Sequence, residues 1–235
     1  FEALPISLVK FVSVFLPLSL VIAVLAHPIV TFLFQGGEFS PGAVRLTAIS
    51  TSCYVLVLPA FSTEYLLMQA FFANRRMVAI TVAGIAFSVV SIAISYVGII
   101  LLGARDLAAL MVVALGYVVS RTLKTGTLIG LLGKTIPCFP FRETAWFLAK
   151  TLGVSGVSAF GAWLARHGTA LVTTGIQAQI AALFQLAAAG LVAVGVFWAA
   201  CRLFRLTEPF EMMSWTMRWV RERRAKRQEA PPPPA

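Results

Sequence analysis

Six long apolar stretches divide this sequence, and their length constrains its fold more than any other feature. They run over residues 8–34, 42–72, 77–102, 106–132, 143–165 and 175–203. Each exceeds the roughly 20 residues that an α-helix needs to cross the hydrocarbon core of a bilayer. Backbone groups in lipid must be hydrogen-bonded internally, and no period-2 alternation appears. The sequence therefore predicts an all-α, polytopic membrane helix bundle.

The composition supports a membrane protein and argues against nucleic-acid binding. Hydrophobic residues make up 59% of the chain and charged residues only 12%, whereas soluble domains are about half apolar and about a quarter charged. The net charge of +10 lies mostly in short connections and in the C-terminal tail. Because no basic patch falls on a soluble domain, we expect no nucleic-acid partner.

The basic residues also predict an orientation. If the N-terminus is cytoplasmic, only Arg45, Arg105 and Arg166 fall in outer connections. The positive-inside rule then places both termini in the cytoplasm. The tail predicts a basic amphipathic helix on the anionic inner leaflet, followed by a disordered proline run. The membrane-surface anchors expected from this pattern are Arg75, Arg76, Arg218, Arg221, Arg223 and Arg224.

Three charged residues inside the predicted spans are the candidates for a substrate path. Glu64 lies ten residues, or about 15 Å, before a predicted inner helix end near Asn74. A carboxylate there is costly unless it faces water or a partner, which makes it a functional candidate. Arg121 and Lys124 share one helix face, at i and i+3. They either bind a diphosphate, pair with Glu64, or act as positive-inside anchors if their helix projects into the cytoplasm.

Prolines and glycines mark the irregular points of the spans. Pro28 and Pro59 interrupt helical hydrogen bonding in the first and second stretches, and neighbouring helices can compensate. The first stretch ends at Gly36 and Gly37, followed by Phe39, with no basic residue nearby. This break predicts that the first span emerges on the non-cytoplasmic side.

Small and hydroxylic residues follow helical spacing in two other stretches. Ser88, Ser91 and Ser95 share one face, which predicts either close helix packing or the lining of a polar cavity. The pairs Ser155–Ala159 and Ser158–Ala162 predict a packing face in the fifth stretch.

The sequence contains no set of residues typical of catalysis. We find no phosphate-binding loop, no metal-ligand cluster and no nucleophile–base–acid set. Three cysteines, Cys53, Cys138 and Cys201, are expected to be thiols outside any metal site. We therefore predict a protein that is not an enzyme and that has no cofactor and no metal.

Two segments resemble a known family. The segment PIVTFLFQGGEF and the helix end QAFFANRR are similar to the MurJ/MviN lipid II flippases, members of the multidrug/oligosaccharidyl-lipid/polysaccharide exporter superfamily. The resemblance covers residues 1–132, and the last two helices match only in number and place. Arg75, Arg76 and Met77 stand where the family often has an acid and a proline, so no role is carried over there. The resemblance implies that the family's best-known cavity arginines belong to the missing first half and to the helix before residue 1, so they are not carried over to this sequence.

The resemblance implies how the chain is organised. Because the chain begins with Phe1 and not Met, we expect it to be the C-terminal part of a fourteen-helix, two-lobe transporter of the bacterial cytoplasmic (inner) membrane, whose missing N-terminal half would be its partner. The last two helices would flank a groove for a lipid tail. The expected parts are four helices of the C-terminal lobe (1–133), a proline-containing cytoplasmic loop (134–142), two additional helices (143–205) and the basic tail (206–235).

The resemblance also implies a function. The protein would move undecaprenyl-diphosphate-linked peptidoglycan precursor, lipid II, from the inner to the outer leaflet by alternating access. Its partners would be membrane lipids and this lipid-linked oligosaccharide. Two alternatives stay open: a polysaccharide or drug exporter of the same superfamily, and a non-transporting scaffold whose basic tail recruits a cytoplasmic partner.

Overall fold

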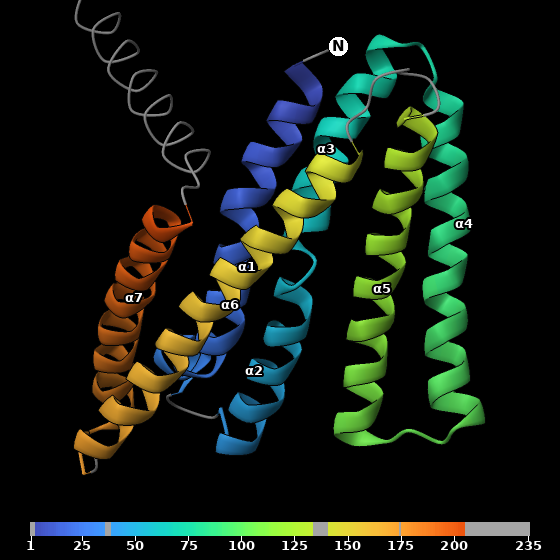
Figure 1. The fold of residues 1–235 in the computed structure, drawn as a ribbon. Helices are drawn as coiled ribbons and strands as arrows, with labels where there is room; N and C mark the ends of the chain where they lie inside the picture. The colour runs from blue at the N-terminus through green and yellow to red at the C-terminus, as the bar shows by residue number, and fades with distance from the viewer. Residues whose placement is uncertain (1–2, 36–38, 134–140, 174, 205–235) are drawn as a thin grey trace, which may run out of the picture.

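The computed structural model describes residues 3–35, 39–133, 141–173 and 175–204. Within these ranges the chain is helical and has no strand, and six segments are long and apolar enough to cross a membrane (Figure 1). The prediction of an all-α polytopic bundle is confirmed. The elements are α1 (Ala3–Phe34), α2 (Pro41–Val55), α3 (Leu58–Ala73), α4 (Met77–Tyr96), the π-helical turn η1 (Val97–Leu101), α5 (Asp106–Gly133), α6 (Phe141–Val172) and α7 (Ala178–Leu203).

The second candidate span is made of two helices, because α2 ends near the middle of the apolar stretch and α3 begins after a short turn. Pro59 has no amide hydrogen to donate to the carbonyl of Val55, four residues earlier. The amides of Leu56 and Val57 instead donate to carbonyls three residues back, over 3.2 and 3.1 Å. The sequence predicted a single stretch over 42–72, and the proline explains why it is interrupted.

The first helix stays continuous although it contains Pro28. This proline leaves the carbonyl of Val24 without its helical donor. Arg166, on α6, donates from Nη1 to that carbonyl over 2.9 Å. Helix α6 extends to Val172, beyond the predicted end at residue 165, and Arg166 therefore lies inside the helix and not in an outer connection.

Helices α6 and α7 pack against α1 and against each other (Figure 1). Ala162, Ala189 and Ala193 form a buried cluster with Leu25 of α1. The hydroxyl of Ser158 donates to the carbonyl of Ala193 over 2.8 Å. The small residues of α6 thus provide the predicted packing face, because short side chains let the backbones approach.

Helices α4 and α5 form a hairpin at the edge of the bundle, and two glycines bring them together (Figure 1). A Cβ atom at Gly98 would lie 2.3 Å from Val112 Cγ1, and one at Gly116 would lie 2.9 Å from Ile94 Cγ2. Only glycine allows this approach. The outward face of α4 carries a row of exposed apolar side chains, as expected for a helix in contact with lipid: Val78, Val82, Ile85, Val89, Ile92 and Tyr96.

The turn between α3 and α4 holds two of the predicted surface anchors. Arg75 has a φ of 56°, in the left-handed region. The amide of Arg76 donates to the carbonyl of Phe71 and that of Arg75 to Phe72, both over 3.0 Å. This is a Schellman motif, in which glycine is the usual left-handed residue. Both arginine side chains are exposed, and their role as anchors stays a prediction.

Several predictions lie outside the described residues. These are the break at Gly36 and Gly37, most of the loop 134–142 with Cys138, and the tail 206–235 with its arginines. Phe39, next to the break, is described and exposed, and its ring lies 5.8 Å from that of Phe34.

Candidate functional site

The three charged candidates meet at one level of the bundle. Helices α3 and α5 run in the same direction (Figure 1). Glu64 lies nine residues before the end of α3 at Ala73, and Lys124 lies nine residues before the end of α5 at Gly133. At 1.5 Å per residue, both are about 14 Å from these helix ends. The carboxylate and the two cations are therefore deep within the predicted spans.

Glu64 receives hydrogen bonds from both cations. Arg121 Nη1 lies 2.9 Å from Oε1 and 2.8 Å from Oε2, and Lys124 Nζ lies 2.6 Å from Oε1. The side chains of Glu64, Arg121 and Lys124 are 7%, 28% and 9% exposed. Of the three alternatives for the two cations, pairing with Glu64 is the one that the structure contains. Their contact with a substrate stays a prediction.

Aromatic side chains hold the guanidinium of Arg121. Its Cζ lies 5.3 Å from the ring centre of Phe61 and 5.5 Å from that of Tyr117. Nε also donates to the hydroxyl of Tyr117 over 3.3 Å. The i, i+4 spacing of Tyr117 and Arg121 is a sequence signal for this contact. Phe61 lies on another helix, and nothing local to Arg121 indicated it.

The cluster carries one more positive charge than negative charge. Among the side chains whose surroundings the structure describes, Glu64 is the only carboxylate. It faces two cations, which leaves a surplus charge of +1 at this level. Burying an uncompensated charge is expensive, so this surplus is unusual in a site that serves only the fold.

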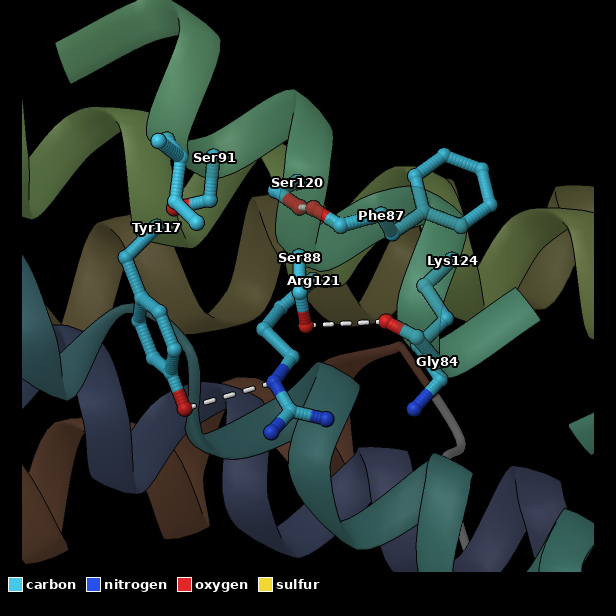
Figure 2. A pocket seen from close by; sticks show the side chains of 9 residues that line it. Gly84, Phe87, Ser88, Ser91, Tyr117, Ser120, Arg121 and Lys124 are labelled. Atoms are coloured by element: carbon cyan, nitrogen blue, oxygen red, sulfur yellow. Dashed lines mark hydrogen bonds between the residues drawn. The ribbon is translucent and has the colours of Figure 1, made fainter. Parts of the chain in front are cut away.

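A pocket of about 350 Å³ opens beside the cations, between α4 and α5 (Figure 2). Figure 2 shows Tyr117, Arg121 and Lys124 extending side by side from α5. A Cβ atom at Gly84 would lie 3.6 Å from Lys124 Nζ, so the ammonium group lies close to the backbone of α4 at this glycine. The lining residues are Gly84, Phe87, Ser88, Ser91, Ile92, Tyr117, Ser120, Arg121 and Lys124.

The serines of α4 line this cavity. Of the two alternatives for the serine face, the structure shows polar lining by Ser88 and Ser91, while Ser95 donates to the carbonyl of Ser91 over 3.0 Å. Ser120, from α5, donates to the carbonyl of Phe87 across the helix pair. Two cations and four hydroxyl-bearing residues line the pocket together with Phe87 and Ile92, and no carboxylate is among the lining residues.

A second, apolar groove of about 340 Å³ lies on the other side of the cluster, between α1, α3, α5 and α6. Pro59 and Thr63 line it from α3, and Thr125 lines it from α5. Thr125 also donates to the carbonyl of Ala60 over 3.2 Å, which ties α5 to the first turn of α3. Helix α6 contributes Thr144, Phe147 and Leu148, whereas α7 contributes no lining residue.

No group of three or more potential metal ligands occurs in the part of the chain that the structure covers. Cys53 and Cys201 are buried in α2 and α7.

Comparison with known families agrees with this architecture. The family model described as lipid II flippase MurJ matches residues 3–198, which includes α6 and most of α7 as well as the first four spans. Comparisons with curated proteins and with solved structures returned no match. The family consists of inner-membrane transporters and not enzymes, which fits the six candidate spans. The chain belongs to the lipid II flippase family MurJ.

Proposed function

We propose that this chain takes part in moving undecaprenyl-diphosphate-linked peptidoglycan precursor from the inner to the outer leaflet by alternating access. The observation that carries the proposal is the family match over residues 3–198. The proposal includes cytoplasmic placement of both termini and two lobes that open in turn, with these helices in the C-terminal lobe.

We further propose that Arg121 and Lys124 lie on the path of the diphosphate. An anionic group crossing the hydrocarbon layer needs positive charge and hydrogen-bond donors at intermediate depth. The cluster supplies both, about 14 Å from the ends of α3 and α5. Its surplus positive charge and its pocket of about 350 Å³ support this role.

We likewise propose that the apolar groove binds the lipid tail. Its lining is almost entirely apolar, and it contains side chains of α1 and α6. Burial of methylene groups there would be favourable by the hydrophobic effect. The groove and the cationic pocket border different faces of α5.

Complementation tests the transport function. The complete gene that encodes this chain is expressed in cells depleted of their lipid II flippase, and growth is expected. Replacing Arg121 and Lys124 by alanine is expected to abolish rescue at normal membrane levels. The triple variant Glu64→Gln/Arg121→Met/Lys124→Met leaves no unpaired charge and separates loss of the path from misfolding.

Lys150 provides a matched control. It rests on the ring of Trp146 at 5.4 Å and lines neither pocket, so Lys150→Ala is expected to rescue. Failure of the stably inserted wild-type protein to rescue would contradict the proposal and favour a polysaccharide exporter or a scaffold. Loss of rescue on deletion of the tail, with full rescue by the triple variant, would favour the scaffold.

A further inference from the structure

We propose that the pocket between α4 and α5 is a phosphate-binding site and that Glu64 is its internal competitor. In the structure the carboxylate of Glu64 holds both Arg121 and Lys124. When a phosphate group enters, Lys124 turns from Glu64 to the phosphate, while Arg121 keeps its contact with Glu64. The inference rests on the proposed function only for the identity of the phosphate compound, and the site itself follows from geometry and charge.

Several hydrogen-bond donors at the pocket have no partner in the described part of the chain. In the described part of the chain, Arg121 uses Nε and Nη1, which leaves both hydrogens of Nη2 unused. Lys124 donates only to Glu64, so two of its three hydrogens remain. The Tyr117 hydroxyl accepts from Arg121 and keeps its own hydrogen, and the Ser91 hydroxyl has no partner in the same part of the chain.

All of these donors belong to residues that line the same pocket. Glu64, by contrast, uses both of its oxygens on the two cations. A pocket with several unused donors, two cations and no carboxylate in its lining suits an oxyanion. Phosphate oxygens accept such charge-assisted hydrogen bonds from arginine and lysine.

The charge balance points to the same ligand. One carboxylate against two cations leaves +1, and one negative charge brought by a phosphate group would neutralise it. Uncompensated charge is least tolerated where water is excluded, and Glu64 and Lys124 are both buried. The cluster can therefore take up one negative charge.

The two cations differ in how firmly they are held. Arg121 is fixed by both oxygens of Glu64, by Tyr117 and by the ring of Phe61. Lys124 has one partner, Glu64, and a flexible four-carbon stem, and it lines the pocket beside Gly84. Lys124 is thus the cation that can change partners with the smaller loss of contacts.

The direction in which Glu64→Gln changes the affinity for phosphate tests the proposal. Binding of inorganic pyrophosphate and of undecaprenyl diphosphate is measured by microscale thermophoresis on the full-length protein in detergent. If Glu64 competes with the ligand, Glu64→Gln tightens binding by about tenfold, which corresponds to about 1.4 kcal/mol. Lys124→Met weakens binding by a similar factor, because Arg121 and Glu64 then form a neutral pair. If Glu64 only positions the cations, Glu64→Gln weakens binding, and the proposal is overturned.

A double variant guards against loss of folding. Glu64→Gln/Lys124→Met restores a net charge of +1 on Arg121 alone, so it is expected to bind more tightly than Lys124→Met. Equal binding by these two variants would overturn the competition between Glu64 and the ligand.

The two probes identify the source of the phosphate. If the variants show this order of affinity for both probes, or for the lipid alone, the ligand is a lipid headgroup. If they show it for pyrophosphate alone, the ligand is a free phosphate compound. Absence of any response to Glu64→Gln and Lys124→Met overturns the site. If this order of binding holds while the wild-type gene fails to rescue flippase-depleted cells, the transport function falls and the phosphate site stands.

Discussion

The charges of the cluster predict that neutralising Glu64 and neutralising Lys124 change the stability of the protein very differently. Glu64→Gln keeps the shape of the side chain and, among the side chains that the structure describes, removes the only negative charge that faces the two cations. Lys124→Met keeps much of the stem and removes the surplus positive charge. We therefore expect the glutamate substitution to be strongly destabilising and the lysine substitution to be nearly neutral.

The magnitudes follow from the geometry. Removing one partner of a buried ion pair costs about 3–5 kcal/mol, because the remaining charge is left uncompensated. The side chain of Arg121 is 28% exposed and so is only partly enclosed by protein, and we expect the lower end, about 3 kcal/mol. After Lys124→Met, Arg121 still binds both oxygens of Glu64. The change in the free energy of unfolding is then expected to stay within about 1 kcal/mol.

Unfolding of the full-length protein by SDS in mixed micelles measures these changes. The double variant Glu64→Gln/Lys124→Met is expected to recover about 2 kcal/mol relative to Glu64→Gln alone, since only one cation is then unpaired. Equal destabilisation by the two single variants would refute the argument. It would mean that another group compensates the second cation and that the cluster has no surplus charge.

Three further predictions concern the backbone. Arg166→Met is expected to lower the free energy of unfolding by about 1.5–3 kcal/mol, because it removes the charged donor from the carbonyl that Pro28 leaves free. The loss is expected to be clearly smaller in a Pro28→Ala background, where the helix supplies its own donor. A double-mutant cycle of unfolding free energies that shows no coupling would contradict this. Gly98→Ala is expected to cost about 1–3 kcal/mol because its Cβ would clash with a valine of α5, whereas Gly126→Ala, with open space around it, is expected to be neutral or stabilising in the same assay. Arg75→Gly is expected to stabilise the protein by about 0.5 kcal/mol, because glycine relieves the left-handed strain but gains entropy in the unfolded chain; a lower thermal midpoint than that of the parent protein would contradict this.

The spans were predictable from sequence because their signal is local. A bilayer demands a certain length of apolar helix, and that length is visible in any window of the chain. The ends of the second, third and fourth stretches fall within one or two residues of the helix ends. Helix α6 was predicted too short because Arg166 interrupts its apolar pattern, and only its contact with Val24 shows why an arginine is accommodated there.

The site was predictable as a set of residues but not as an arrangement. Charges within apolar spans identify Glu64, Arg121 and Lys124 without any structure. Their pairing joins positions 57 and 60 residues apart, and it depends on the level at which α3 and α5 pack. The serine face of α4 is similar, since only the position of α5 decides that Ser88 and Ser91 line a cavity.

The sequence by itself determined that this chain spans the membrane as six apolar segments and which ionisable side chains they carry, because lipid imposes these requirements on each segment separately. The tertiary structure decided which charges meet, where a pocket opens and which donor satisfies the carbonyl freed by Pro28. These outcomes depend on how neighbouring helices approach, through glycines such as Gly98 and Gly116 and through the break before Pro59. Helix packing combines small contributions from distant positions, so no local pattern in the sequence encodes it.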